Sequence, residues 1–419
     1  MSEIMNIIKD FAKGCPCGVD HTTTVRDVVI ESGVVTRVGE ILKKNGFTKK
    51  LLLVADKNTL KASEGIIESL EDFDIEYKIY DDIRVAEMKH VCEIEALISG
   101  REISVLSVGT GSVNDPCRLA CARQNKLLCI FGTAPSMDGF ASYSSPIVAN
   151  GFKASYDAKS PEVIIADTKI LAKAPAYLKS AGFGDMIAKF IGICDWEIAH
   201  VLIGEYYCPR ISEYVRKTVT ELLEMADTVT VENEETAGKI FEQLLKTGIF
   251  MSFTKNSRPA SGSEHIIAHL LECLELPKGI IPNYHGEDVG VCTLTMLKYY
   301  KELAKHESIK AKREIVDWDE VYEVYGEEMA PDVEKLNSPT TVTDLVDPAD
   351  LENKWQTIRE IINKLPDYDK CYDAMKRAGC KTTVEEIGKE QELFDTCIEF
   401  SPFMRRRLTL LRMKKMIEL

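Results

Sequence analysis

The chain has 419 residues, a formal net charge of −15 and 45% hydrophobic residues. At about 150 residues per domain, this length predicts two or three domains, and the composition is typical of a soluble globular protein. The negative charge argues against nucleic acid as a partner, because a phosphate backbone requires a basic face.

The N-terminal segment mixes Glu3, Lys9, Asp10 and Lys13 with single apolar residues. It therefore lacks the apolar core of a signal peptide. No apolar run approaches the length of a membrane span. These features predict a cytoplasmic protein without a membrane span.

Thirteen cysteines in such a chain are expected to be reduced and mostly buried as small hydrophobic side chains. Only Cys15-Pro16-Cys17, with His21 four residues on, resembles a cluster of metal ligands. It lacks the second cysteine pair that structural zinc sites use. We therefore expect the metal chemistry of this chain to lie elsewhere.

Residues 25–170 alternate short apolar runs with helical patterns. The runs that predict strands are Arg26–Ile30, Lys50–Ala55, Tyr77–Tyr80, Ile103–Val108, Leu127–Phe131 and Val163–Ala166. Helical periodicity falls between several of them, for example at Val35–Lys44 and Ala62–Leu70. Strands separated by helices of this length predict a largely parallel sheet with right-handed crossovers.

Asp56 follows the second predicted strand directly. A carboxylate at this place can accept hydrogen bonds from an adenosine ribose. The alternative is that Asp56 caps the helix that follows.

A glycine-rich turn, Gly109-Thr110-Gly111-Ser112-Val113-Asn114-Asp115, follows the fourth predicted strand and leads into a helix at Arg118–Gln124. Glycines let the backbone approach a pyrophosphate, and the helix N-terminus supplies N–H donors. The turn lacks the spacing of the usual dinucleotide fingerprint, so on its own it is a weak signal.

Thr133-Ala134-Pro135-Ser136-Met137-Asp138-Gly139 follows the fifth predicted strand. Open α/β sheets bind ligands at the carboxyl ends of their strands. The hydroxyl groups could bond a cofactor, and Asp138 could orient a substrate hydroxyl. The alternative is an ordinary Pro-Ser-Asp-Gly turn.

Beyond about Ala174 the strand signal stops. The amphipathic stretches that predict helices there include Phe183–Leu202, Ile211–Met225, Glu235–Thr247, Glu264–Glu272 and Val291–Leu303. We therefore predict an α/β nucleotide-binding domain over residues 1–174 and an all-α domain over 175–419. The highly charged stretch from Glu307 to Lys354 predicts a solvated surface excursion.

Three segments of the chain carry ligands for one divalent metal: Asp185, His265 and His285. Mixed oxygen and nitrogen donors from three residues leave coordination positions open, which is typical of a catalytic metal. Each residue has an ordinary alternative. Asp185 would be the first residue of a helix, where the helix dipole stabilises its negative charge. His285 would lie in a loop that leads into a helix.

His265 and His269 are four residues apart, on one face of a predicted helix. Ser261 and Glu264 fit a capping box that would fix its start. A nucleotide in one half of the chain and a metal in the other suggest hydride transfer.

Taken together, Gly109–Asp115, Thr133–Ser142, Gly182–Lys189, Ser257–His269 and His285–Gly290 resemble the glycerol-1-phosphate dehydrogenases. These belong to the superfamily of iron-type alcohol dehydrogenases, glycerol dehydrogenases and dehydroquinate synthases. The most specific stretch is Ser257-Arg258-Pro259-Ala260-Ser261-Gly262-Ser263-Glu264-His265. Cys15-Pro16-Cys17-Gly18 and Arg405-Arg406-Arg407-Leu408-Thr409 look like the bacterial branch.

The resemblance implies a dehydroquinate synthase-like fold with the active site in the cleft between its domains. Asp185, His265 and His285 would hold the metal, nickel or zinc with iron possible, and Asp138, Asp185 and His269 would face the substrate. The residues that it assigns to NAD or NADP are Asp56, Gly109, Thr110, Gly111, Ser112, Val113, Thr133, Ala134, Pro135, Ser136 and Ser142.

The implied reaction interconverts dihydroxyacetone phosphate and sn-glycerol 1-phosphate, with a role in phospholipid metabolism. The metal would acidify the substrate hydroxyl so that hydride can pass to the nicotinamide, and His269 would relay the proton. We also expect a homo-oligomer, a dimer or larger. Two departures from the family pattern are Thr110, where a glycine is common, and Arg118, where a lysine is often found.

Three other functions compete with this one. A glycerol or other polyol dehydrogenase would ignore phosphate, for which Lys255, Arg258 and Arg210 are the candidate partners or merely solvated charges. A dehydroquinate-synthase-like lyase normally has a glutamate where Asp185 stands. A nucleotide-binding protein without metal is disfavoured by the intact set of three ligands.

Overall fold

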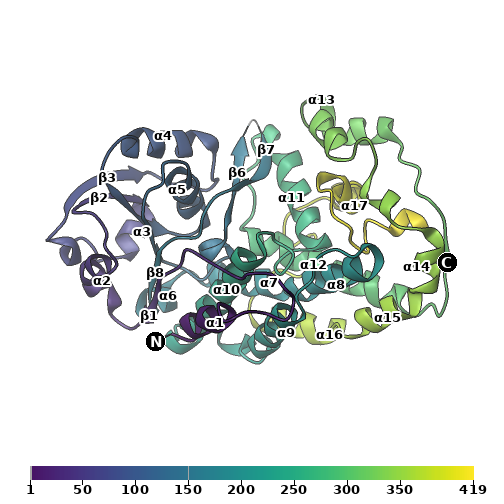
Figure 1. Ribbon diagram of the computed structural model, residues 1–419, viewed down its shortest axis with the longest axis horizontal. Coiled ribbons are helices and arrows are strands. Elements are labelled where there is room, and N and C mark those ends of the chain that lie inside the picture. The colour runs from purple at the N-terminus through teal and green to yellow at the C-terminus, as the bar shows by residue number, and fades with distance from the viewer. Residues whose placement is uncertain (1, 150) are drawn as a thin grey trace. The chain divides into compact units, whose positions relative to one another are not determined.

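The computed structural model describes residues 2–149 and 151–419, and it separates into two compact units (Figure 1). The first unit comprises Met1–Met186 and Glu224–Ser257, and the second comprises Ile187–Leu223 and Arg258–Leu419. Each unit thus draws on two stretches of the chain. The domain boundary that we predict after residue 174 stays a prediction.

The first unit contains a six-stranded sheet with the order β1-β8-β5-β4-β2-β3, in which every neighbouring pair is parallel. The strands are β1 (Asp27–Glu31), β2 (Lys50–Asp56), β3 (Asp74–Tyr80), β4 (Ser104–Gly109), β5 (Leu128–Gly132) and β8 (Val163–Asp167). All six predicted strands and the parallel arrangement are confirmed.

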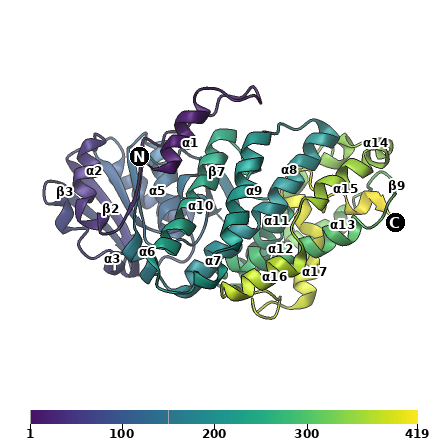
Figure 2. The same ribbon diagram turned by 90° about the horizontal axis from the view of Figure 1, so that it is seen from below.

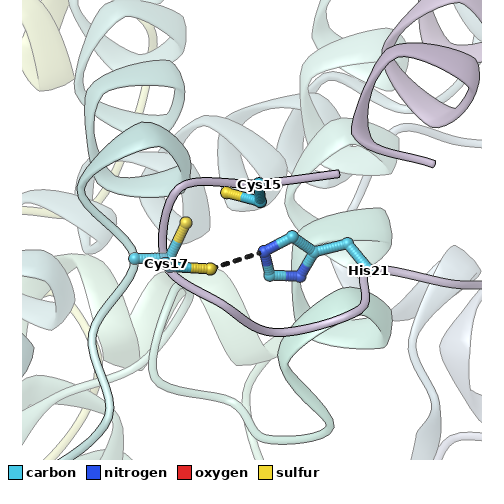
Figure 3. A group of neighbouring side chains, drawn as sticks. Cys15, Cys17 and His21 are labelled. Atoms are coloured by element: carbon cyan, nitrogen blue, oxygen red, sulfur yellow. Dashed lines mark hydrogen bonds between the residues drawn. The ribbon is translucent and has the colours of Figure 1, made fainter. Parts of the chain in front are cut away.

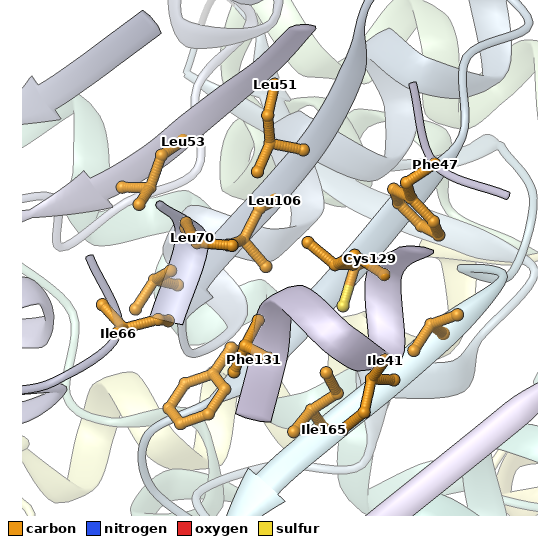
Figure 4. Close-up of a cluster of buried hydrophobic side chains, with 14 of the residues drawn as sticks. Ile41, Phe47, Leu51, Leu53, Ile66, Leu70, Leu106, Cys129, Phe131 and Ile165 are labelled. Atoms are coloured by element: carbon orange, nitrogen blue, oxygen red, sulfur yellow. The ribbon is translucent and has the colours of Figure 1, made fainter. Parts of the chain in front are cut away.

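Alternate residues of these strands enter two different cores. Leu51, Leu53, Leu106, Phe131 and Ile165 point to one face, where they pack with α2 (Val38–Lys44) and with the short helices η1 (Val34–Arg37) and η2 (Glu68–Leu70) (Figure 4). All five side chains are fully buried. Burial of each contributes about 1.5–3 kcal/mol to stability, so the period-2 pattern holds the sheet in register.

Helices α4 (Met88–Ile98) and α5 (Gly111–Arg123) lie on the other side of the strands from α2 (Figure 1). The remaining helices of this unit are α1 (Glu3–Phe11), α3 (Lys57–Ala62), α6 (Thr168–Lys173), α7 (Ala176–Ile187, whose last residue is grouped with the second unit), α10 (Glu234–Thr254), η3 (Gly139–Ala141) and η4 (Ala226–Thr228). The predicted helix over Ala62–Leu70 is wrong, because the chain turns at Gly65 with a φ of 93°, which only glycine adopts readily.

The sequence pattern misses an antiparallel hairpin, β6 (Ser144–Ala149) with β7 (Phe152–Asp157). Pro146 within β6 removes a donor and argues against a strand. The hairpin tolerates it because β7 is the only full strand beside β6 in this sheet, and on its other side β6 has just the isolated bridge of Val148 with Glu87 among the described residues.

The second unit is helical, apart from the two-residue strands β9 (Lys310–Ala311) and β10 (Ile417–Glu418). Helix α8 packs against α11, α12 and α15, and α12 packs against α11 and α15 (Figure 2). Its helices are α8 (Lys189–Ile203), α9 (Pro209–Leu223), α11 (Ser263–Glu275), α12 (His285–Leu303), α13 (Trp318–Leu336), α14 (Pro348–Asn353), α15 (Trp355–Asn363), α16 (Tyr368–Arg377), α17 (Gln391–Phe400), η5 (Leu276–Lys278), η6 (Val342–Leu345), η7 (Ser401–Met404) and η8 (Lys414–Met416). The fold class predicted from the sequence is confirmed.

The predicted surface excursion between Glu307 and Lys354 is wrong. Two helical stretches of α13, which meet at a break at Gly326 (φ 69°), fill much of it and bury Val321, Tyr325 and Val333. Charged residues between them hide these apolar positions in a composition average. Of the helices in the described ranges, none combines the length and apolar character needed to cross a bilayer.

Candidate functional site

Strands β2 and β4 are neighbours, but the connections that follow them run in opposite directions along the sheet. The chain passes from β2 outward to β3 and from β4 toward β5. Ala55 pairs with Val108, so Asp56 and Gly109 end the two strands side by side. Such a point of reversal is where open α/β sheets bind ligands.

The glycine-rich turn closes tightly over the start of α5. A Cβ atom at Gly109 would lie 3.0 Å from Val113, and one at Gly111 would lie 3.2 Å from the Cε atom of Met137. Thr110 is the N-cap residue of α5, so the helix starts earlier than the predicted Arg118. Its thirteen residues direct N–H groups and a positive dipole end to this edge of the sheet.

Asp56 is the N-cap residue of α3. Its Oδ1 atom accepts a hydrogen bond of 2.8 Å from the backbone N–H of Thr59, and its own N–H donates to Thr59 Oγ1 at 3.1 Å. The capping alternative is therefore confirmed. A ribose contact by Asp56 stays a prediction. The hydrogen bond from Thr59 holds the carboxylate in one orientation.

Arg118 organises the segment that follows β5. Its buried guanidinium donates to Ser145 Oγ at 3.0 Å and to the carbonyl oxygen of Gly139, and it pairs with Asp115. Burial raises the pKa of Asp115 to about 6, and Arg118 opposes that shift. Arg118 thus holds the loop beyond Asp138 through a planar fork, which a lysine could not reproduce.

The residues of this loop that the sequence assigns to a cofactor lie along the first unit's sheet edge. Thr133, Ser136 and Ser142 are each less than 10% exposed. The backbone N–H of Thr133 donates to the carbonyl oxygen of Gly109 at 3.3 Å, so the two predicted cofactor turns are hydrogen-bonded to each other. Their contact with a nucleotide stays a prediction.

Asp185 lies near the end of α7, so the prediction that it opens a helix is wrong, and so is the N-terminal dipole alternative. The buried carboxylate accepts a hydrogen bond of 2.9 Å at Oδ2 from the backbone N–H of Asp138. This contact joins two residues that the sequence assigns to the substrate side. Both lie in the first unit.

Gly182 allows α7 to approach the loop this closely. A Cβ atom there would lie 1.9 Å from the carbonyl oxygen of Pro135 and 3.3 Å from Leu244. We expect Gly182→Ala to lower the free energy of unfolding by about 1–3 kcal/mol, since the backbone must shift. Urea denaturation measures this, and an unchanged midpoint would show that α7 tolerates the displacement.

Three imidazoles gather in the second unit. His265 and His269 lie on α11, one turn apart, with ring centroids separated by 6.2 Å. His285 begins α12, so this helix starts earlier than the predicted Val291, and its ring lies 5.2 Å from that of His265 and 5.4 Å from that of His269. The pairing of α11 with α12 therefore joins histidines that are sixteen or more residues apart.

A carboxylate lies beside the Nδ1 atom of two of these histidines. Glu264 Oε1 is 2.6 Å from Nδ1 of His265, and Glu272 Oε1 is 3.5 Å from Nδ1 of His285. Glu264 is fully buried, and its Oε2 atom has no hydrogen-bond partner among the described residues. Buried negative charge of this kind favours a cation nearby.

The predicted capping box of Ser261 and Glu264 is wrong. Gly262 is the N-cap residue of α11, and Glu264 accepts a hydrogen bond of 2.8 Å from its backbone N–H. Ser261 instead accepts hydrogen bonds of 3.0 Å from Arg407 at its carbonyl and hydroxyl oxygens. The terminal arginine segment therefore holds the loop that leads to His265.

Asp195 positions the same loop and was not singled out from the sequence. It accepts hydrogen bonds from Ser263 N–H and Oγ, from Tyr300 and from the backbone of Leu410. Burial raises the pKa of Asp195 to about 6, against the opposing effect of these donors. An acidic residue within an apolar helical stretch was the only available signal.

The basic residues considered for a substrate phosphate differ in their surroundings. Arg258 is 2% exposed and forms a bidentate ion pair with Glu205, so its fork is already occupied. Lys255 ends α10 in a left-handed conformation with a φ of 51°. A phosphate contact by Lys255 or Arg210 stays a prediction.

The family model described as iron-containing alcohol dehydrogenase matches residues 29–175. A glycerol-1-phosphate dehydrogenase that uses NAD(P)+, from Bacillus licheniformis, is 27% identical over 98% of this chain and 94% of its own length. The enzyme of that name from Methanothermobacter thermautotrophicus is 31% identical over 77% of this chain and 86% of its own length.

Among solved structures, the NADH-dependent butanol dehydrogenase A of Thermotoga maritima superposes with a TM-score of 0.62 at 14% identity. The match covers 93% of this chain and 92% of that chain. At this identity the likeness shows the fold. It agrees with the parallel sheet and the helical second unit described above.

Proposed function

The chain belongs to the family of the glycerol-1-phosphate dehydrogenases, and we propose that it interconverts dihydroxyacetone phosphate and sn-glycerol 1-phosphate with NAD(P)H. The observation that carries the proposal is the cluster of His265, His269 and His285 with carboxylates beside two of the rings. This cluster suits a metal, and the switch point of the sheet suits a dinucleotide.

We propose Asp185, His265 and His285 as the ligands of one divalent ion, nickel or zinc, with iron as a further candidate. Metal-binding histidines usually donate their second N–H to a carboxylate, which fixes the tautomer and raises the basicity of the ligand nitrogen. Glu264 is hydrogen-bonded to Nδ1 of His265 in this way, and Glu272 lies 3.5 Å from Nδ1 of His285, near enough to do the same after a small shift. The residues of the second unit therefore fit the ion, with Nε2 of both histidines as the ligand atoms.

When bound, the ion supplies Lewis acidity to an oxygen of the substrate. Asp185 is held in its orientation by the N–H of Asp138. His269 lies one turn from His265 without being needed as a ligand, and we assign it to hold or move the proton of the substrate hydroxyl. Asp138 is assigned to orient the substrate.

The nucleotide is proposed to lie at the sheet edge formed by Asp56, Gly109 and Thr133. The close approach at Gly109 and Gly111 leaves backbone N–H groups of α5 to bind a pyrophosphate. We propose that the other predicted cofactor residues also contact the nucleotide, because they lie on the same edge of the sheet. We also propose that the protein acts in phospholipid metabolism and assembles as a homo-oligomer.

Replacing Asp56 tests the ribose contact. A carboxylate repels a 2′-phosphate, so we expect Asp56→Ser to raise the ratio of NADPH to NADH catalytic efficiency (kcat/KM). Serine remains a good N-cap residue for α3, so stability changes little and the loss of charge is isolated. Asp56→Asn also caps α3 and removes the charge without shortening the side chain, so it should change the ratio in the same direction. An unchanged ratio in both variants would show that Asp56 does not contact the ribose.

The competing polyol dehydrogenase is tested by the substrate's phosphate. We compare kcat/KM for dihydroxyacetone phosphate with that for dihydroxyacetone, both with NADH. The proposal predicts a preference of several orders of magnitude for the phosphorylated ketone, because phosphate contacts supply binding energy in the transition state. Equal values for the two ketones would favour the polyol dehydrogenase.

A further inference from the structure

Two thiols and an imidazole lie close together in the loop that follows α1 in the first unit, outside the proposed active site. Cys17 Sγ is 3.1 Å from His21 Nε2, and Cys15 lies on the same side of the loop (Figure 3). The possible ligand atoms of these three residues all lie within 4.8 Å of one another. In the sequence this cluster lacks the second cysteine pair that structural zinc sites use.

A tight turn brings the two thiols together. The carbonyl oxygen of Cys15 accepts a hydrogen bond of 3.0 Å from the N–H of Gly18. Pro16 occupies the second position of this four-residue turn, which it favours because its φ is preset. Gly18 follows with a φ of 79°. The Cys-Pro-Cys-Gly order is therefore what the turn requires, and the turn presents both sulfur atoms to His21.

His21 is held as a ligand would be. It is 1% exposed and packs between Phe11 and Phe253, with centroid distances of 5.3 and 5.5 Å. Its Nδ1 atom lies 3.4 Å from the carbonyl oxygen of Phe253, which can only accept a hydrogen bond. The proton of a neutral ring thus belongs on Nδ1, and the lone pair of Nε2 faces the thiols. This is the second-shell arrangement of a metal-binding histidine.

We propose that Cys15, Cys17 and His21 supply three of the four ligands of a zinc ion that has a structural role. Two thiolates and an imidazole are donors that zinc prefers. Tetrahedral zinc with ordinary bond lengths places its sulfur and nitrogen ligands about 3.6 Å apart, so Cys17 and His21 need to separate by only about half an ångström.

The ion would anchor the N-terminal segment to α10. Phe253 belongs to α10, whose Lys246 also forms an ion pair of 2.9 Å with Glu3 of α1. Phe11 at the end of α1 packs on Phe253 at 5.1 Å. A metal at Cys15, Cys17 and His21 would cross-link the loop that follows α1, next to these contacts with α10. We therefore expect it to raise thermal stability while leaving the catalytic ion in place.

Cobalt substitution tests the site directly. Cobalt bound by thiolates absorbs through ligand-to-metal charge transfer, whereas the proposed catalytic ligands contain no sulfur. We expect this absorption in the cobalt-loaded wild type and in Cys92→Ser, which removes an exposed cysteine of the same unit. Cys17→Ser should lose the absorption and about one equivalent of metal per chain. A Cys17→Ser protein that keeps both would overturn the proposal.

X-ray absorption at the zinc edge of the wild-type protein removes any dependence on the folding of a variant. We expect sulfur neighbours at about 2.3 Å. Spectra with only nitrogen and oxygen neighbours, or a Cys15–Cys17 disulfide in the mass of the protein as purified from reducing buffer, would contradict the inference. An inactive protein that shows zinc–sulfur scattering would instead refute the proposed function and support this site.

Discussion

Removal of the catalytic ion with a chelator is expected to abolish turnover with dihydroxyacetone phosphate. The side chains proposed to face the substrate are Asp138, Asp185 and His269, and none of them is a strong electrophile. Without the ion, nothing in this set stabilises the charge that develops on the substrate oxygen. Nickel or zinc added to the stripped protein should restore the rate, measured as oxidation of NADH.

The proposed zinc site at Cys15 would also respond to chelators, so the experiment is repeated on Cys17→Ser. Loss and recovery of activity in this variant then report only the ion proposed to bind at Asp185, His265 and His285. Full activity in a preparation that contains no metal by mass spectrometry would end the proposal of metal-assisted chemistry.

His265→Ala and His269→Ala are expected to fail in different ways. His265 is a proposed ligand whose Nδ1 is paired with Glu264, so its replacement should remove the metal and leave a buried carboxylate without its partner. His269 lies one turn further along α11. Its replacement should keep the metal and lower kcat by about 10²- to 10⁴-fold, the range typical of acid–base groups.

Metal content and kcat, measured on the same samples, separate the two roles. Glu272→Gln serves as a milder control, because it keeps the size of the side chain 3.5 Å from Nδ1 of His285 while the carboxylate charge is lost. It should weaken metal affinity by about 10- to 100-fold, as second-shell changes do. A His269→Ala protein with normal turnover, or a His265→Ala protein with its full metal content, would show that the roles on α11 are wrongly assigned.

The sheet could be predicted from the sequence because its four central strands, β8, β5, β4 and β2, are buried on both faces. Runs such as Leu51–Ala55 and Ile103–Val108 are nearly continuous in apolar residues, which is typical of parallel strands. The histidine pair on α11 could be predicted for a similar reason, since a spacing of four residues fixes a common helical face. Local patterns of this kind need no knowledge of distant contacts.

The features that were missed depend on contacts between distant segments. Asp185 looks like a helix start because Gly182 and Gly184 precede it, yet α7 runs through these glycines since Gly182 packs against Pro135. The start of α11 is fixed by Asp195 and Arg407 rather than by the local Ser261–Glu264 pair. No periodicity in the sequence encodes such tertiary partners.

The oxidation of NADH and of NADPH with dihydroxyacetone phosphate, followed by chiral analysis of the glycerol phosphate formed, tests the proposed function most directly. We predict turnover with both cofactors, a preference for NADH because of Asp56, and sn-glycerol 1-phosphate as the product. Formation of sn-glycerol 3-phosphate, or no consumption of either cofactor by the metal-loaded protein, would contradict the assignment of this chain's activity.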